Sequence, residues 1–312
     1  MTLFFYGTNA YALRQQLQQM VVAYRKKAGS DYGLERIDGA AVKPRDLLAA
    51  LQASPFLANS RLLIVEGVAG NKLVAEKLGD MLGKVPATTV VVFVEREVDR
   101  RTNAFRSLSK ADKVVNFEPV TGPKLLGWIK SEVERLGGTI DRGALTELVD
   151  VAGEDQWRLA EEIQKLVNYA PEVSVASVRE LVTPSAERSI FDMVEAMAAG
   201  KADVAVRGYH DLLRQRESEI YVLTMVQWQL RNLLMAKTAP NMSPAELASA
   251  AGMSPFVAGK MLAAQGGMSE DYLKKAYSAA ANCEFDIKSG RLKAEAAVEQ
   301  LIWRVATAVS AR

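Results

Sequence analysis

The sequence predicts an α/β domain built on a parallel sheet, followed by a region made only of α-helices. Two apolar runs, Leu-Leu-Ile-Val at residues 62–65 and Thr-Val-Val-Val-Phe-Val at residues 89–94, carry this prediction. Continuous apolar runs of this length are typical of strands that are covered on both faces, as in a parallel sheet. Strand and helix patterns alternate up to about residue 120, and only helical spacing follows, which predicts α/β and then all-α structure.

The expected elements of the α/β domain follow from this alternation. A strand pattern at residues 3–6 leads directly into helical spacing at residues 11–24. Further strands are expected at residues 34–37, 62–65, 89–94 and 114–117, and further helices from Pro44 and over residues 73–82. We therefore expect a first domain over residues 1–120.

The rest of the chain predicts two groups of helices. Thr121-Gly122-Pro123 is a break that favours a domain boundary. Three short amphipathic helices are expected over residues 121–183, with Asp141 as an N-cap and an ion pair between Glu161 and Lys165 at helical spacing. Residues 184–312 predict five or six helices and no strand. One of these should end at the sequence Asp-Ile-Lys-Ser-Gly over residues 286–290.

Composition excludes several classes of protein. The 312 residues suggest about two or three domains, and the hydrophobic content of 49% is ample for their cores. One cysteine, Cys283, cannot form an internal disulfide, and with one histidine, His210, no His/Cys cluster can hold zinc. The net charge of +2 is too small to mark a nucleic-acid binder on its own. Neither a membrane span nor a secretory signal is present in the sequence, so we expect a cytoplasmic protein.

The connection after the first strand lies where many nucleotide-binding domains place a phosphate loop. Here it reads Gly-Thr-Asn-Ala-Tyr-Ala over residues 7–12, and no lysine occurs before Lys26. A phosphate loop needs several glycines for close backbone approach and a Lys-Ser/Thr pair for phosphate and magnesium. We therefore expect the architecture of a nucleotide-binding domain without its cofactor, and no metal ligands or catalytic residues.

The segment between the second helix and the third strand is unusual because it carries adjacent large apolar residues. Pro55 is followed by Phe56 and Leu57. Two interpretations remain open: both side chains fold back into the core, or they form an exposed plug for a pocket on a partner. A proline-stiffened loop loses little entropy on docking, which favours strong binding in the second case.

A second segment at a strand end, Asp99-Arg100-Arg101, also has two interpretations. Charged residues at the carboxyl ends of parallel strands often belong to functional sites. A capping Asp99 before the next helix explains the segment equally well. Without a phosphate loop nearby, we favour the structural interpretation.

Several modest motifs in this order resemble the delta subunit of the bacterial DNA polymerase III clamp loader, over nearly the whole chain. In the first domain they are Phe5-Tyr6-Gly7 with Tyr11 and Leu13, Pro55-Phe56-Leu57 with Arg61-Leu62, and Asp99-Arg100-Arg101. In the helical region they are residues 162–166, residues 190–193 with Gly200, residues 227–231, Pro255-Phe256 and residues 286–290. The ordered set is specific, although each motif alone is not.

The resemblance implies a degenerate AAA+ (RecA-like) parallel-sheet domain over residues 1–120, a three-helix lid over 121–183 and a helical collar over 184–312. It implies a subunit without intrinsic catalysis in the DNA polymerase III holoenzyme, which binds and opens the sliding clamp (the beta subunit) for loading onto primed DNA. The implied clamp-binding residues are Pro55, Phe56 and Leu57. The resemblance also implies that the collar joins the other clamp-loader subunits and that DNA is bound only within the complex, and we expect no membrane partner.

This sequence departs from the family pattern in two places. Family members often carry a second aromatic residue where this chain has Leu57. The first strand also follows only two residues, Met1 and Thr2. Two alternatives are kept: a nucleotide-dependent enzyme with a nonstandard phosphate site at residues 7–11, and a helical adaptor protein.

Overall fold

The computed structural model describes residues 1–55, 58–239 and 241–310. The chain divides into two compact units, Met1–Val120 and Thr121–Arg312. The first unit is α/β and the second is almost entirely helical, which confirms the predicted fold class. The predicted division of the helical region at residues 183 and 184 stays a prediction.

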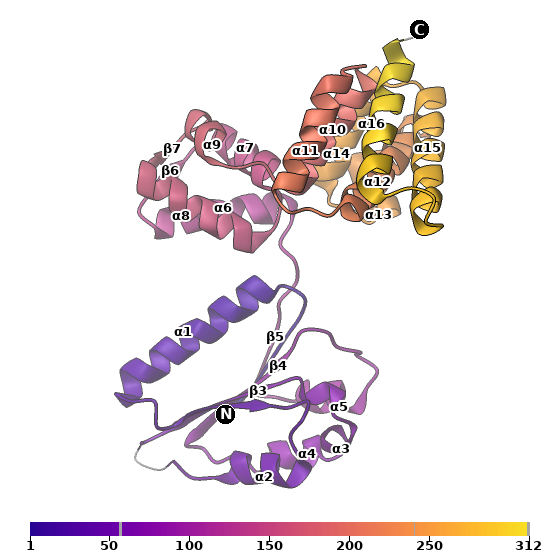
Figure 1. Cartoon of the computed structure of the whole chain (residues 1–312). Helices are drawn as coiled ribbons and strands as arrows, with labels where there is room; N and C mark the ends of the chain where they lie inside the picture. Colours follow the sequence, from indigo (N-terminus) through magenta and orange to yellow (C-terminus); the bar gives the residue numbers. More distant parts are fainter. Residues whose placement is uncertain (56–57, 240, 311–312) are drawn as a thin grey trace. The chain divides into compact units, whose positions relative to one another are not determined.

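The α/β unit alternates strands and helices along the chain (Figure 1). In chain order its elements are β1 (Thr2–Tyr6), α1 (Ala10–Ala28), β2 (Leu34–Asp38), α2 (Pro44–Gln52), β3 (Arg61–Glu66), the 3₁₀ turn η1 (Val68–Gly70), α3 (Lys72–Ala75), α4 (Leu78–Leu82), β4 (Thr89–Glu95), α5 (Asn103–Leu108) and β5 (Lys113–Asn116). Within the described residues, its strands form one sheet in the order β2-β3-β4-β1-β5, and each neighbouring pair is parallel. The runs at residues 62–65 and 89–94 are thereby confirmed as parallel strands.

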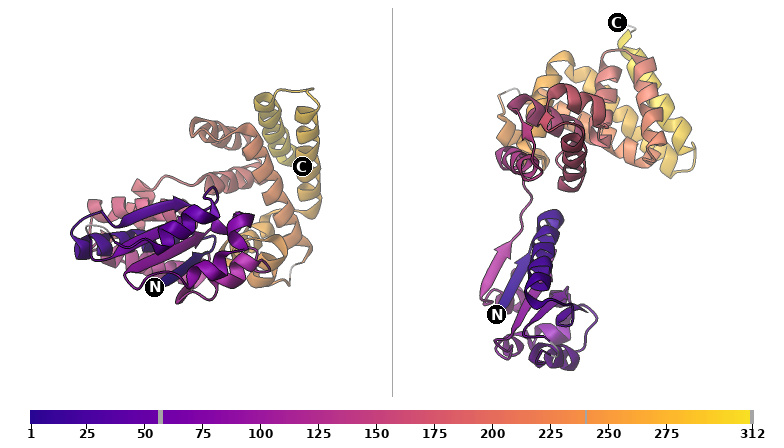
Figure 2. Two further views of the ribbon diagram at one scale, coloured as in Figure 1. Left: turned by 90° about the horizontal axis from the view of Figure 1, so that it is seen from below. Right: turned by 90° about the vertical axis from the view of Figure 1, so that its left-hand side faces the viewer.

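Both faces of this sheet are covered, as the apolar strands require. The helix α1 lies along one face of the sheet (Figure 2). Leu13, Leu17 and Val21 of α1 belong to one core cluster with residues of β1, β3 and β4. The shorter helices α2 to α5 cover the other face, where Phe4 and Phe93 are fully buried. Alternate residues of each central strand therefore enter two separate cores.

The helix expected over residues 73–82 is split in two. The N–H of Lys77 donates to the carbonyl of Val74, only three residues back, so the chain tightens into a 3₁₀ turn between α3 and α4. This break still buries Val74 and Leu78 against the sheet. The apolar spacing that predicted one helix over residues 73–82 is therefore found in two short helices, α3 and α4.

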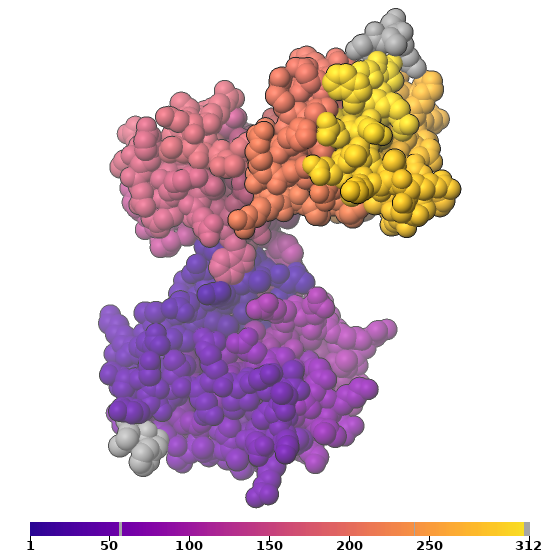
Figure 3. Space-filling model, viewed as in Figure 1, coloured from indigo at the N-terminus to yellow at the C-terminus, as the bar shows by residue number. Residues whose placement is uncertain are grey.

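The helical unit begins with a small group of helices and continues into a larger one. The first group comprises α6 (Gly122–Arg135), β6 (Thr139–Ile140), α7 (Arg142–Ala152), α8 (Gln156–Tyr169), β7 (Glu172–Val173) and α9 (Val175–Leu181). The second comprises α10 (Ala186–Ala198), α11 (Ala202–Arg214), α12 (Glu219–Thr238), α13 (Pro244–Ala251), α14 (Pro255–Ala264), η2 (Gln265–Gly267), α15 (Glu270–Lys288) and α16 (Ala294–Ser310). In the space-filling view the yellow α16 forms part of the outer surface of this unit (Figure 3).

Local predictions for the helical unit have mixed outcomes. Asp141 caps α7 by accepting from the N–H of Ala144 at 2.8 Å, as predicted. The sequence analysis missed α9 and the short parallel pair of β6 and β7, and the second group has more helices than the five or six expected. The predicted ion pair of Glu161 with Lys165 is wrong, because Lys165 pairs with Glu162 instead.

Among the described helices, none combines the length and the apolar character that a membrane span requires.

Gly7, in the connection between β1 and α1, shows why this turn has its sequence. Its φ of +126° lies in a region that favours glycine, and a Cβ added there would lie 2.3 Å from the carbonyl oxygen of Phe117. The glycine is therefore required by close packing against the chain that follows β5.

We predict that Gly7→Ala lowers the free energy of unfolding by at least about 2 kcal/mol, because it combines backbone strain with a clash against main-chain atoms. Urea unfolding of the full chain measures this loss. Gly83→Ala is the matched control, since Gly83 has a φ of −69° and nothing within 4 Å of its added Cβ. An equal effect of the two substitutions would contradict the packing argument.

Candidate functional site

The predicted clamp-binding residues lie between α2 and β3. Phe56 and Leu57 are outside the described residues, so their assignment stays a prediction. Pro55 is described and half-buried. The structure does describe what holds the two ends of this segment, and those supports involve residues that sequence reasoning did not assign to the site.

Arg61, the first residue of β3, joins the end of α2 to the sheet. Its guanidinium is buried, and Nη1 donates to the carbonyl oxygens of Ala50 and Ala53, each at 2.8 Å. Its Nη2 contacts the carboxylate of Glu35 on β2 at 2.5 Å. Carbonyls at a helix C-terminus lack helical partners and carry partial negative charge, so a cation stabilises them. Arg61 therefore holds the point where the chain leaves α2 next to the point where it enters β3.

The second support comes from α1. The hydroxyl of Tyr24 donates to the carbonyl oxygen of Ser60 at 3.0 Å, and Tyr24 is 9% exposed. Gly33 makes room for this contact, because a Cβ there would lie 2.2 Å from the Tyr24 hydroxyl. The segment containing Pro55 is thus fixed at both ends by buried groups. Nothing in the sequence indicates that Arg61 and Tyr24 hold this segment, except that Arg61 is part of a motif that resembles the family.

The connection between β1 and α1 uses most of its backbone N–H groups internally. The N–H of Gly7 donates to the carbonyl of Glu95, that of Asn9 to Phe117, and that of Ala10 to Thr8, each at 3.0 Å. The side chain of Asn9 caps α1 by accepting from the N–H of Ala12. A phosphate loop binds its anion through such N–H groups. Their occupation here argues that this turn is a structural connection.

Glu95 ends β4 at the same edge of the sheet. It is 5% exposed, and its Oε1 accepts from the N–H of Ala69 in the turn after β3 at 2.7 Å. Burial raises the pKa of the Glu95 carboxyl to about 7, even though the N–H groups of Ala69 and Val68 favour the charged form. This carboxyl ties the end of β4 to the chain after β3.

Asp99-Arg100-Arg101 is a self-contained turn. The carboxylate of Asp99 accepts from the backbone N–H of Arg101 at 2.9 Å and from its guanidinium, which lowers the pKa of Asp99 to about 2. The predicted cap is corrected, because the side chain of Thr102 caps α5. The favoured structural interpretation fits these contacts.

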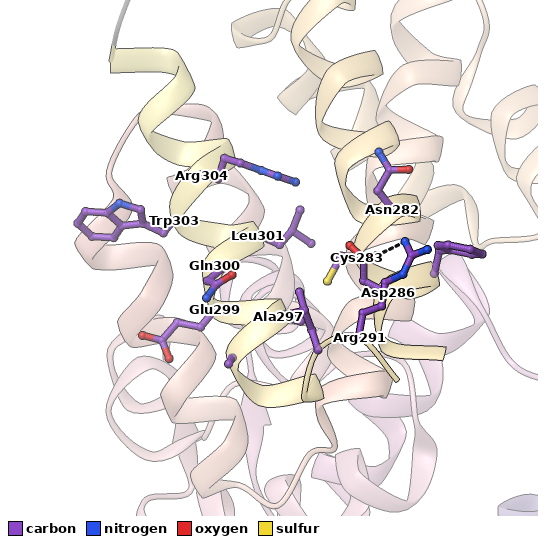
Figure 4. Close-up of a pocket in the computed structure, with 13 residues that line it drawn as sticks. Asn282, Cys283, Asp286, Arg291, Ala297, Glu299, Gln300, Leu301, Trp303 and Arg304 are labelled. Carbon is purple, nitrogen blue, oxygen red and sulfur yellow. Dashed lines mark hydrogen bonds and ion pairs between the residues drawn. The ribbon is translucent and has the colours of Figure 1, made fainter. Parts of the chain in front are cut away.

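The helical unit also has a candidate interaction surface, which lies between α15 and α16. A cavity of about 950 Å³ is lined there by residues of both helices (Figure 4). Arg304 extends from α16 toward α15, whereas Trp303 projects away from it. Phe285, Leu292 and Trp303 are all exposed, at 59%, 42% and 54%. These exposed apolar side chains make the surface around α15 and α16 a candidate for contact with another protein.

We predict that the pH dependence of unfolding reports the burial of Glu95. Because its folded-state pKa lies above its ordinary value of 4.5, its contribution is fully present at low pH and is lost as the pH rises toward 7. Relative to Glu95→Gln, the wild type should lose about 2 kcal/mol of unfolding free energy between pH 5 and pH 8. Urea unfolding at both pH values measures this, with the exposed Glu97→Gln as the matched control. A difference that does not change with pH would contradict it.

Two family models match the chain. The model described as DNA polymerase III, delta subunit, matches residues 3–118, and the model of the DNA polymerase III delta subunit, C-terminal domain, matches residues 187–305. DNA polymerase III subunit delta of Bacillus subtilis (strain 168) is 22% identical over 303 residues, covering 92% of this chain and 87% of the relative.

The structure described as Bacillus subtilis DNA clamp loader delta protein shares this fold. It matches with a TM-score of 0.65 and 21% identity, and the match covers 98% of this chain and 95% of that chain. One family model falls on the α/β unit and the other on α10 to α16. The resemblance inferred from the sequence is confirmed: the chain belongs to the DNA polymerase III delta subunit family.

Proposed function

We propose that this chain is a clamp-loader subunit that binds the ring-shaped sliding clamp and helps to open it for loading onto primed DNA. Membership of the delta subunit family supports this function. The observation that carries the proposal is the double anchoring of the segment with Pro55, Phe56 and Leu57, by Arg61 at one end and Tyr24 at the other.

Anchoring matters because it lowers the entropic cost of docking. Phe56 and Leu57 supply about 1.5 to 3 kcal/mol each if a clamp pocket covers them fully. A segment whose ends are held by buried hydrogen bonds loses less freedom on binding than an unrestrained loop. The proposed role of Arg61 and Tyr24 is therefore to position these residues without touching the clamp.

Opening requires more than binding. A protein shifts the equilibrium between closed and open clamp only by its difference in affinity for the two states. The proposal is that Phe56 and Leu57 bind the opened or strained ring more tightly than the closed one. ATP binding in partner subunits would control access to this segment.

This chain contributes no ATP hydrolysis in the proposed function. The N–H groups of Gly7, Asn9 and Ala10 already donate to carbonyls of the chain. This occupation weighs against the alternative of a nucleotide-dependent enzyme with a phosphate site in the same turn. The neighbouring clamp-loader subunits would bind ATP instead.

The remaining partners follow from the helical unit. We propose that α10 to α16 form the collar that joins other clamp-loader subunits, and that the exposed Phe285, Leu292 and Trp303 belong to such contacts. Primed DNA would be met within the assembled complex in the cytoplasm. The alternative is a helical adaptor that does not bind a clamp. The effect of Phe56→Ala/Leu57→Ala on clamp binding distinguishes it from the proposed function.

We predict that Phe56→Ala/Leu57→Ala lowers affinity for the organism's own sliding clamp by at least about tenfold, because it removes apolar burial. Binding of the purified full chain without ATP measures this. The matched control is Tyr32→Ala/Leu73→Ala, which removes exposed apolar residues of the same unit. Unchanged clamp binding by Phe56→Ala/Leu57→Ala would contradict the proposal that these residues enter a clamp pocket. ATP binding by the isolated chain would support the alternative of a nucleotide-dependent enzyme.

We also predict that Arg61→Lys weakens clamp binding several-fold. A lysine keeps the charge, but it cannot reproduce the planar fork that reaches Ala50, Ala53 and Glu35. The loss of hydrogen bonds should cost about 1 to 2 kcal/mol of unfolding free energy. Gly7→Ala is the comparison, since it destabilises the same unit elsewhere. An equal effect of both variants on clamp affinity would show that Arg61 acts only through stability.

A further inference from the structure

A cavity of about 820 Å³ lies within the helical unit, where α7 and α8 face α10, α12 and α14. Its size is that of a ligand pocket, and none of the residues used in the proposed clamp site lines it. Side chains from both groups of helices converge on it. The cavity is therefore a separate candidate site, and its chemistry does not depend on the proposed function.

The cations around this cavity are largely engaged within the fold. Asp150 pairs with both Arg188 and Lys260, and Arg188 also contacts Asp192 at 3.0 Å. The Nη2 atom of Arg158 donates to the carbonyl oxygen of Thr183 at 2.7 Å, whereas its buried Nε has no hydrogen-bond partner among the described residues. These contacts connect α7 to α10 and α14.

The carboxylates around the cavity fall into two sets. Asp150 is paired as described, Asp155 accepts from the backbone N–H of Arg158, and Glu187 accepts from the hydroxyl of Tyr221. Glu154, Glu161 and Glu217 line it, and within the described residues none of them has an ion pair. Lys165, the expected partner of Glu161, is bound to Glu162. The Oε1 atom of Glu154 is buried and has no hydrogen-bond partner among the described residues. Glu161 is exposed, whereas Glu154 and Glu217 are half-buried. A ligand with positive charge would pair with these carboxylates and would give the buried Oε1 of Glu154 a partner.

Gln229 of α12 gives an independent indication of a ligand. This residue lines the cavity and is only 3% exposed, yet its side-chain amide nitrogen has no hydrogen-bond partner in the part of the chain that is described. A buried donor left unpaired costs about 1 to 3 kcal/mol. A carbonyl oxygen from a ligand would remove that cost.

Aromatic rings complete the lining. Trp157, Tyr221 and Trp228 line the cavity together with Phe191 and Phe256. Lys260 already lies over the rings of Phe191 and Phe256, at 5.6 and 5.4 Å from their centroids. Planar guanidinium groups stack on such rings more readily than ammonium groups do.

We propose that this cavity binds an arginine side chain presented by a peptide segment of a partner protein. The guanidinium is bound by carboxylates that lack ion pairs, Glu154 and Glu161 among them, and is covered by the aromatic rings. A peptide carbonyl of the same segment accepts from Gln229. Arginine fits this lining because it combines charge, several donors and a flat face.

The test uses the full chain labelled with 5-fluorotryptophan and followed by ¹⁹F NMR. The probe is N-acetyl-arginine N-methylamide, and the uncharged control is the corresponding citrulline compound. The signals of Trp157 and Trp228 should shift on titration, whereas those of Trp128 and Trp303, which lie outside the cavity lining, should not. Citrulline should bind about tenfold more weakly than arginine, since it lacks the charge.

Variants assign the binding to the named groups. Glu154→Gln/Glu161→Gln should weaken arginine binding by about tenfold, and Gln229→Leu should weaken it without loss of fold. Glu172→Gln/Glu180→Gln is the matched control, because both residues are exposed and outside the cavity lining. Equal binding of citrulline, no shift at Trp157 and Trp228, or no effect of the first variant would each overturn the proposal. Tighter binding of spermidine than of the arginine probe would assign the site to a free polyamine and overturn it as well.

Discussion

The structure of the α/β unit depends on one constraint, which is that β1, β3 and β4 are buried on both faces. Such strands pair in parallel, so each connection must cross from the carboxyl edge of the sheet back to the amino edge. The connection from β1 to α1 and the residue Glu95 lie at the carboxyl edge. Arg61 starts β3 beside Thr89, the first residue of β4, at the amino edge. The turn that resembles a phosphate loop and the segment before Arg61 are therefore placed at opposite edges of one sheet.

These two edges have contrasting chemistry. At the carboxyl edge the N–H groups of Gly7 and Asn9 donate to backbone carbonyls, and the buried carboxyl of Glu95 accepts from the N–H of Ala69. At the amino edge, Arg61 and Tyr24 direct their buried hydrogen bonds at the carbonyls flanking one short segment. The sheet is parallel throughout its described strands, and the buried contacts near its amino edge hold the two ends of the segment that is proposed to bind the clamp. This contrast unites the family membership with the proposed function.

Sequence patterns predicted what depends on local periodicity. The apolar runs of β3 and β4, the cap at Asp141 and the end of α15 were all found where the sequence placed them. The split between α3 and α4 and the pairing of β6 with β7 depend on tertiary contacts, so periodicity alone does not report them. In the candidate site, the residue types of Pro55, Phe56 and Leu57 led to their prediction as clamp-binding residues, and this stays a prediction. The contacts of Arg61 were not predicted, because its partners lie 8 to 26 residues away in the chain.

The central claim is that Phe56 enters the clamp from an anchored segment. Its most direct test places the photo-crosslinker p-benzoylphenylalanine at position 56 and, as a control, at the exposed position of Leu73. The full chain is mixed with its organism's sliding clamp without ATP and irradiated, and the crosslinked residues are mapped by mass spectrometry. Crosslinks from position 56 to one apolar pocket of the clamp, with none from position 73, are the predicted result. Complex formation without any crosslink from position 56 would contradict the account.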